Sequence, residues 1–312
     1  MKWGIQAGKH RYYCKVCNRF FTASNAANSL NNKIVWLEKW VIQRQTLNYI
    51  SKDSGYSIAT LKRLFSSFLK EPPPFQFKSR SDVHLIIDGT YFSNDICLVL
   101  YQDNDIKYTQ LYRFSSSERY DEILEDLNNL SIMGISISSI TCDCHKAVLK
   151  AIRAHNSQII VQRCLVHVHR MANIWLRINP KTLSSNELKV CLKSLPHIKT
   201  NNDKLAWINS FKEWERKHKA FTNEKSYNFD SSRWWYKHKE LRRAYVLVKQ
   251  AIPDMFHFLN NPKIPKSTNS LESFFGHLKD NLSIHRGISY ENRKSFIRWY
   301  LHFKNQKRHR FS

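Results

Sequence analysis

The chain has 312 residues, 42% of them hydrophobic and 13% aromatic, which excludes a disordered basic tail and allows a sizeable buried core. Its 50 Lys and Arg residues against 25 Asp and Glu give a net charge of +25, which indicates a polyanionic partner, nucleic acid first, rather than a merely basic soluble protein. Seven cysteines do not form a disulfide pattern at this length, and neither an apolar run of about 18 residues nor a secretion signal is visible, so we expect a cytoplasmic protein without a membrane helix.

The first 30 residues are basic and aromatic and contain two cysteines three positions apart. Cys14 and Cys17 have the Cys-x-x-Cys spacing of a metal knuckle in a reducing compartment. This segment is therefore a candidate metal site.

Residues 33–70 are predicted to be helical. An amphipathic helix is followed by two more, separated by a Ser-Gly break, and Ser57 opens the last of them. This pattern predicts a helix-turn-helix DNA-binding domain whose second helix enters a major groove. Lys62 and Arg63 on that helix are candidates for base or phosphate contacts; the alternative is that they are solvated surface charges.

After a proline-rich linker at 71–82, residues 83–179 change to a strand period. Three consecutive strands are predicted, with turns at Asn94–Asp95 and Asn104–Asp105, and strands then alternate with helices. This order predicts an α/β fold with a mixed sheet and covering helices. Residues 180–265 lose the strand signal and are predicted to be helical, and residues 266–312 open with another helix and end in a basic tail.

Three acids stand at positions that call for an explanation. Asp88 lies inside the apolar run "HLIIDGTYF", where an unpaired charge is costly unless a cation neutralises it; the alternative is an Asp-Gly hairpin turn. Asp143 ends a predicted parallel strand, with a helix N-cap as the alternative. Glu272 is predicted in the first turn of a helix, where a capping box with Asn269 is the alternative. Together they predict a site that holds Mg²⁺ for phosphodiester chemistry.

The motifs around these acids resemble the Mutator-like group of Asp-Asp-Glu transposases, including bacterial insertion-sequence members. "IIDGTYF" is similar to the first catalytic segment, and "STNSLESFFGHLK" is similar to the third. "TCDCHKAV" resembles the second, with Cys144 in place of the usual Gly. "QRCLVHVHRM" has the Cys-x-x-His signature, and "SSRWWYKHKELRRAY" resembles the tryptophan-bearing part of a helical insertion.

The resemblance implies an RNase H-like mixed sheet, interrupted by an all-helical insertion at 180–265 before its last catalytic helix. It implies that Asp88, Asp143 and Glu272 are catalytic and bind Mg²⁺ or Mn²⁺. The residues Cys164, His167, His145, Lys146 and Asn269 would then shape the site. For Cys164 and His167 a zinc site with Cys142 and Cys144, or simple packing, are the alternatives.

Related proteins often begin with a zinc ribbon of two Cys-x-x-Cys knuckles, which the N-terminus matches only in part. A structural zinc ion needs four ligands, whereas Cys14 and Cys17 supply two and His10 is a poor third. We therefore expect a partial zinc-ribbon-like segment with an incomplete Zn²⁺ site. A start placed too late, a degraded ribbon or ligands from another chain would each explain it.

Basic and aromatic residues interleave at 233–243. Arg233, Lys237 and Arg242 could hold phosphates while an aromatic ring stacks on an unpaired base. The alternative is that the tryptophans pack in the core, which we expect of one of the pair. The resemblance favours Trp234 as the member that faces DNA.

These features together predict a DNA transposase. It would bind the terminal inverted repeats of its element, cleave by water attack and join the 3′-hydroxyl to double-stranded target DNA, as a homodimer or higher oligomer. Two alternatives stay open, which are a non-catalytic DNA-binding regulator and an RNase H-like structure-specific nuclease.

Overall fold

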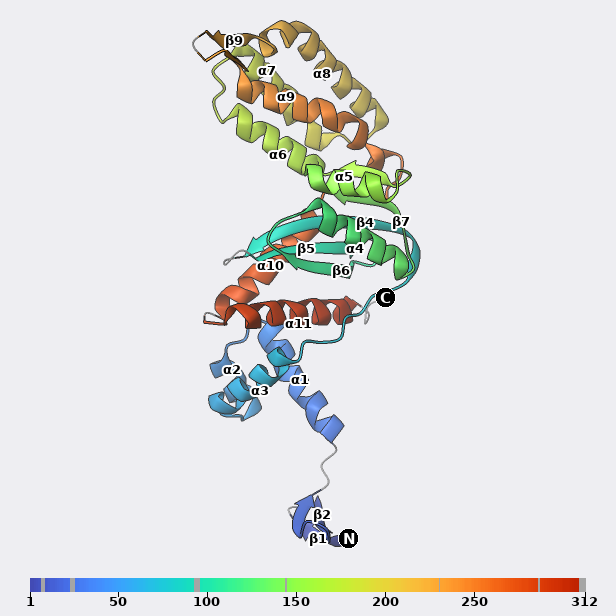
Figure 1. The fold of residues 1–312 in the computed structure, drawn as a ribbon, viewed down its shortest axis with the longest axis vertical. Helices are drawn as coiled ribbons and strands as arrows, with labels where there is room; N and C mark the ends of the chain where they lie inside the picture. The colour runs from blue at the N-terminus through green and yellow to red at the C-terminus, as the bar shows by residue number, and fades with distance from the viewer. Residues whose placement is uncertain are drawn as a thin grey trace. The chain divides into compact units, whose positions relative to one another are not determined.

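Figure 1 shows the computed structural model of the chain, which describes residues 1–6, 9–22, 26–92, 96–143, 145–229, 231–285 and 287–308. The predicted turn at Asn94–Asp95 and the unusual Cys144 lie outside these residues. The chain divides into two compact units. Unit 1 comprises Met1–Pro73 and Asp280–Lys304, and unit 2 comprises Pro74–Lys279 and residues 305–312.

The N-terminal segment of unit 1 is a three-stranded antiparallel sheet. Its strands β1 (Lys2–Gln6), β2 (Lys9–Cys14) and β3 (Arg19–Thr22) pair in chain order. Cys14 ends β2, and the exposed Cys17 lies in the turn that follows. Hydrogen bonds with Cys17 lower the pKa of Cys14. Since no third metal ligand joins these two cysteines among the described residues, zinc binding stays a prediction.

The rest of unit 1 is helical. Helix α1 (Ala26–Ile42) precedes α2 (Leu47–Ser54) and α3 (Ile58–Lys70). Gly55 ends α2 in the left-handed region at φ 74°, and the Ser57 side chain accepts a hydrogen bond from the Thr60 N–H at the start of α3. The predicted helix, Ser-Gly break and second helix are therefore confirmed as secondary structure.

Helix α11 (Tyr290–Arg308) runs mostly in unit 1. The Trp299 indole N–H donates to the Phe68 carbonyl at 2.9 Å, and Trp40 packs between Phe65 and Phe296. The sequence analysis assigned all of residues 266–312 to the same domain as the sheet. The difference arises because the apolar face of α11 is complementary to the aromatic residues of α1 and α3, which lie more than 200 positions away.

Unit 2 contains a mixed sheet, as predicted, and its five strands have the order β6-β5-β4-β7-β8. The strands are β4 (Arg80–Phe92), β5 (Ile96–Asp103), β6 (Tyr108–Ser115), β7 (Ile135–Cys142) and β8 (Ile160–Arg163). The first three pair antiparallel, whereas β7 and β8 add in parallel. Asp88 pairs with Leu100 inside β4, so the predicted continuous strand is confirmed and the Asp-Gly turn is excluded.

Two helices pack on this sheet through one apolar core. Helices α4 (Tyr120–Ile132) and α5 (Lys146–His155) contribute Leu127 and Ile152, which are buried with Leu85, Ile87 and Val99 of the central strands. Residues 83–88 of β4 and all of β5 are buried without alternation, because both faces of these central strands are covered. This core holds the strand that carries Asp88.

The segment after the sheet is mainly helical, with α6 (Leu165–Leu176), α7 (Leu183–Lys193), α8 (Asn201–Thr222) and α9 (Lys239–Ala251) around their own aromatic core. Single turns of 3₁₀-helix lie at Leu195–His197, Ile252–Asp254 and His257–Leu259. Helix α10 (Asn269–Ile284) follows. No helix in the described ranges is both long and apolar enough to span a bilayer.

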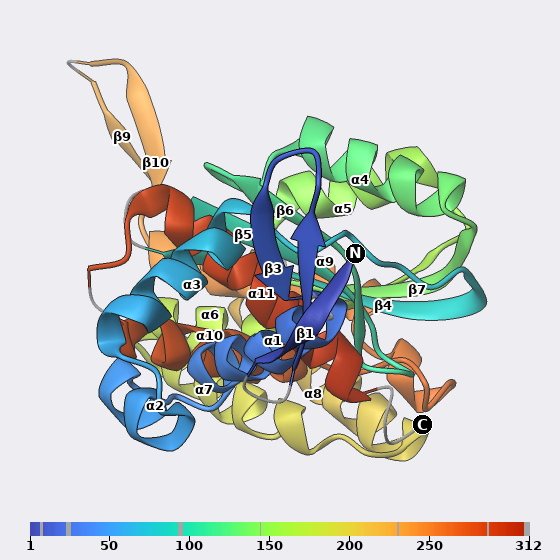
Figure 2. The ribbon, with the colours of Figure 1, turned by 90° about the horizontal axis from the view of Figure 1, so that it is seen from below.

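The predicted all-helical character of 180–265 is wrong at one place. Strands β9 (Lys225–Asn228) and β10 (Arg233–Tyr236) form an antiparallel hairpin that projects from the helices of unit 2 (Figure 2). The reason is local, because Tyr and Trp favour strands and the polar residues between the two strands favour a turn.

Candidate active site

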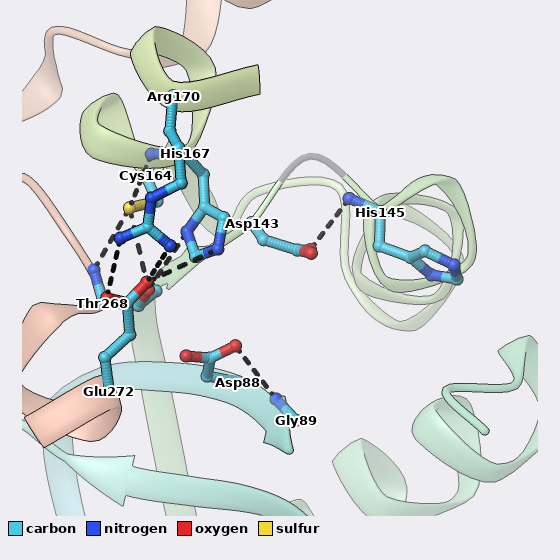
Figure 3. A network of polar contacts seen from close by, with 9 residues as sticks. All are labelled: Asp88, Gly89, Asp143, His145, Cys164, His167, Arg170, Thr268 and Glu272. Carbon is cyan, nitrogen blue, oxygen red and sulfur yellow. Dashed lines mark hydrogen bonds and ion pairs between the residues drawn. The ribbon is translucent and has the colours of Figure 1, made fainter. Parts of the chain in front are cut away.

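Asp88 is the acid at the centre of β4. Its side chain is buried, with 8% of the residue exposed, and it accepts a hydrogen bond from the Gly89 N–H at 3.0 Å (Figure 3). Burial raises the pKa of Asp88 to about 7; the charge of His167 opposes this, and those of Asp143 and Glu118 add to it. Asp88 therefore belongs to an electrostatic cluster that it shares with residues far away in the sequence.

Asp143 lies beside Asp88 because of the register between β4 and β7. Ile86 pairs with Thr141 in this parallel ladder, so the residues two positions further along each strand lie at the same level. Asp143 Oδ1 accepts a hydrogen bond from the His145 N–H at 2.8 Å. The alternative role of Asp143 as the N-cap is wrong, because His145 is the N-cap residue of α5. His145 and Lys146 are exposed at the start of that helix.

Glu272 lies in the first turn of α10, as predicted. Its carboxylate is bound by Arg170 of α6, whose Nη2 and Nη1 lie 3.1 and 3.3 Å from the two oxygens. The Nε2 atom of His167 lies 3.5 Å from Glu272 Oε1. Asn269 is the exposed first residue of the helix. Figure 3 shows the Glu272 carboxylate at this Arg170–His167 pair.

Cys164 joins the strand and helices that carry the acids. Its N–H donates to the Cys142 carbonyl at 2.7 Å, which ties the start of α6 to the end of β7. Its sulfur accepts from the Thr268 N–H at 3.3 Å and from the His167 N–H at 3.5 Å. These contacts place the start of α10 beside α6 and support a positioning role for Cys164.

The Cys164 and His167 side chains influence each other's protonation. Burial raises the pKa of Cys164, but the hydrogen bonds from His167 and Thr268 outweigh it and the net shift is downward. The bond with Cys164 raises the pKa of His167 to about 9, with burial opposing and the charges of Cys164, Asp88 and Asp143 adding to it. His167 therefore carries a positive charge among the acids at neutral pH.

Sequence reasoning missed Glu118, which lies in the loop between β6 and α4. Its side chain is 13% exposed, and its Oε2 atom lies 3.8 Å from His145 Nδ1. Burial and then the charge of Asp143 raise the pKa of Glu118. A Cβ atom at position 89 would overlap the Glu118 carboxylate, so Gly89 makes room for it. A glycine inside a strand signals such a close approach, and this was the available clue.

The DNA-contact candidates lie on α3 in unit 1 and in the hairpin region of unit 2. On the hairpin, Trp234 and Trp235 are 53% and 50% exposed, so the expectation that one of them is buried in the core is wrong. Both belong to the two-stranded hairpin that projects from the helices of unit 2. Lys225 lies over the Trp234 ring at 4.1 Å. Lys62 and Arg63 are exposed on α3 in unit 1.

Three further basic candidates surround the hairpin. Arg233 is exposed at the start of β10, and Lys237 forms an ion pair with Glu224. The Arg242 guanidinium lies 3.8 Å from the Tyr236 ring centre and donates to the Asn223 side chain. The hairpin therefore combines exposed aromatic rings with cations, as the sequence predicted.

The sequence of the chain matches one known protein family. A family model described as transposase, Mutator family, matches residues 109–307. The chain belongs to the Mutator family of transposases. The matched range contains Asp143, the Cys164–His167 pair and Glu272 but begins after Asp88. No curated protein matches the sequence.

The acids of this Mutator-family chain have the ligand type that a divalent cation prefers. Carboxylate oxygens are hard donors, and burial together with mutual repulsion raises the pKa of Asp88, a cost that a bound cation would reduce. In the described part of the chain, however, no three His, Cys, Asp or Glu residues are grouped as metal ligands. Arg170 occupies the Glu272 carboxylate instead.

We expect Arg170→Ala to tighten the binding of Mn²⁺ by about tenfold. The guanidinium is a cation that competes for Glu272, and both groups are partly exposed, so the effect is moderate. Isothermal titration with Mn²⁺ in the absence of DNA measures it. Arg153→Ala is the control, because that arginine pairs with Asp254. Weaker Mn²⁺ binding in Arg170→Ala would show that Arg170 positions Glu272 for the metal.

Glu118→Gln should lower the pKa of Asp88 below about 7, because the negative charge of Glu118 is one of the causes that raise it. Side-chain ¹³C NMR titration of Asp88 provides the readout. Glu122→Gln is a matched control, since Glu122 lies in the following helix α4 and accepts a hydrogen bond from Ser115 Oγ at 2.5 Å. An unchanged Asp88 titration would remove Glu118 from the cluster.

Proposed function

We propose that this chain is an insertion-sequence transposase that cleaves DNA at the ends of its element and joins the 3′-hydroxyl to target DNA. The register of β4 and β7, which sets Asp88 and Asp143 side by side, carries the proposal. Glu272 on α10 faces the same cluster through His167. The sheet order is consistent with an RNase H-like fold.

Asp88, Asp143 and Glu272 would hold Mg²⁺ or Mn²⁺. When bound, such ions activate a water or hydroxyl nucleophile and stabilise the leaving oxygen of a phosphodiester. The protein's own part is to keep the acids together. Cys164 holds the starts of α6 and α10 against the end of β7, and the positive His167 offsets part of the acids' repulsion. Arg170, which binds the Glu272 carboxylate, would compete with these ions for it.

The α2–α3 pair supports a DNA-binding role for unit 1. We propose that α3 enters a major groove of the element's terminal repeat and that Lys62 and Arg63 contact phosphates there. Arg233, Trp234, Lys237 and Arg242 of the hairpin region would contact the DNA near the cut, because they combine cations with exposed rings. Joining requires two ends, so the active form is proposed to be a dimer or higher oligomer.

Replacing both Lys62 and Arg63 by Ala should weaken binding of duplex DNA and reduce the slope of log K against log salt by about 2, since each phosphate contact contributes about 1. Fluorescence anisotropy at several salt concentrations measures the slope. Lys70→Ala, an exposed lysine at the end of the same helix, is the control. An unaltered slope in the double variant would mean that these charges are merely solvated.

The proposal is tested with purified protein, Mg²⁺ and a labelled duplex carrying one element end. The expected products are a nick at the end and, with target DNA added, a joined strand. Absence of nicking would favour a DNA-binding regulator, and nicking without joining would favour a nuclease.

A further inference from the structure

A pocket of about 670 Å³ lies in unit 2 beside Asp143. Residues of α5, α6 and α9 line it, together with Tyr236 at the base of the hairpin. The volume is in the range of pockets that hold small ligands, about 300–1,000 Å³. Because Asp143 forms part of the wall, a ligand here would be next to the acid cluster.

The charge of the wall selects an anionic ligand. The described residues that line the pocket include one acid, Asp143, against the basic residues Lys146, Arg163, Lys239, Arg242 and Arg243 and two histidines. Arg163 and Arg243 form ion pairs with Asp254 and Glu240, which reduce the repulsion among these cations, and an anion in the pocket would reduce it further. The pocket is therefore built for a group such as a phosphate.

Arg163 provides a second, independent indication. This last residue of β8 is 8% exposed, and its Nε atom has no hydrogen-bond acceptor among the described residues. Arg163 does form an ion pair with Asp254, but Oδ2 of that residue lies 3.6 Å from Nε, which is beyond hydrogen-bond distance. A buried N–H without a hydrogen-bond acceptor is costly, and an oxygen of a ligand in the pocket that Arg163 lines would accept this hydrogen bond.

The remaining wall selects a flat, apolar group. The Arg243 guanidinium lies 5.3 Å from the Trp175 ring centre, and that of Arg242 lies 3.8 Å from the Tyr236 ring centre. Leu149 and Val246 add aliphatic surface. A ligand with both a phosphate and an aromatic ring satisfies both sets of groups, and a nucleotide is such a ligand.

We propose that this pocket binds one unpaired nucleotide of the DNA strand, adjacent to the phosphate that is cut. The inference rests on the proposed function, because it places the DNA backbone at Asp88 and Asp143. The cations hold the phosphates of the strand, and the base stacks on the ring and guanidinium planes of the wall. The enzyme thereby distinguishes a frayed or single-stranded end from an intact duplex.

The test compares the affinities of the full chain for a blunt duplex and for the same duplex with a one-nucleotide extension of 2-aminopurine. Measurements are made in EDTA, so no cleavage occurs. We expect about tenfold tighter binding of the extended duplex, the effect of one stacked base, and quenching of the 2-aminopurine fluorescence. Arg243→Gln and the pocket-filling Leu247→Trp should both abolish the preference. Lys249→Ala on the same helix, which pairs with Glu215, should retain it.

The outcomes separate this inference from the proposed function. Equal affinity for the two duplexes, or a preference that survives both Arg243→Gln and Leu247→Trp in folded protein, would overturn the pocket assignment and leave DNA binding intact. Competition by free dAMP at micromolar concentration would assign the pocket to a free nucleotide, against the proposal. Failure to bind either duplex would overturn both.

Discussion

Asp88→Asn is expected to reduce DNA nicking and strand joining by about a thousandfold or more. The carboxylate is proposed to bind the ions that stabilise the transition state, and such stabilisation is worth several kcal/mol. The asparagine side chain is nearly isosteric and leaves β4 paired with β5 and β7. DNA affinity measured without metal should therefore stay within about twofold of the native value.

The matched control for this loss is Asp82→Asn on the same strand. Asp82 is exposed, accepts a hydrogen bond from Ser138 at 2.7 Å and lies 3.6 Å from Lys263. Its φ of 55° is a conformation that asparagine tolerates. Nicking by Asp82→Asn should equal that of the native chain. Undiminished joining by Asp88→Asn would exclude Asp88 from the chemistry and with it the proposed site.

The same Asp88→Asn substitution is expected to stabilise the fold at pH 8 by as much as about 4 kcal/mol. The pKa of Asp88 is about 7 in the folded chain against an ordinary 3.8, so the folded state resists its ionisation. A carboxyl group whose pKa is raised on folding contributes stability below pH 3.8, and this contribution is lost as the pH rises through about 7. Asparagine does not ionise, so the variant does not lose this stability as the pH rises.

The attraction between the charges of Asp88 and His167 already lowers the Asp88 pKa to about 7 and is part of that limit, but Asp88→Asn also changes the titration of His167. Its pKa is raised from 6.5 to about 9, so its contribution to stability is present below pH 6.5 and is lost as the pH rises through 9. Removing Asp88 also removes one of the charges that favour the imidazolium. Urea unfolding of both proteins at pH 4 and pH 8 measures the difference. A difference that does not change with pH, or a less stable variant at pH 8, would contradict the buried charge.

Much of the chain's local structure could be predicted from its sequence. The strand through Asp88, the mixed sheet and the Gly55–Ser57 break follow from residue periods and caps, which act over a few neighbouring positions. That the strands of Asp88 and Asp143 are neighbours was only a condition of the sequence argument, and the pairing of β4 with β7 establishes it.

Only the tertiary structure revealed the partners of these residues. The Arg170–Glu272 contact joins positions about 100 residues apart, and Glu118 reaches the site through the space left by Gly89. The placement of α11 with the N-terminal helices, and the pocket beside Asp143, depend on packing between distant segments. Sequence periodicity specifies which face of an element is apolar. Complementary shape and charge in the folded chain decide which other element that face contacts.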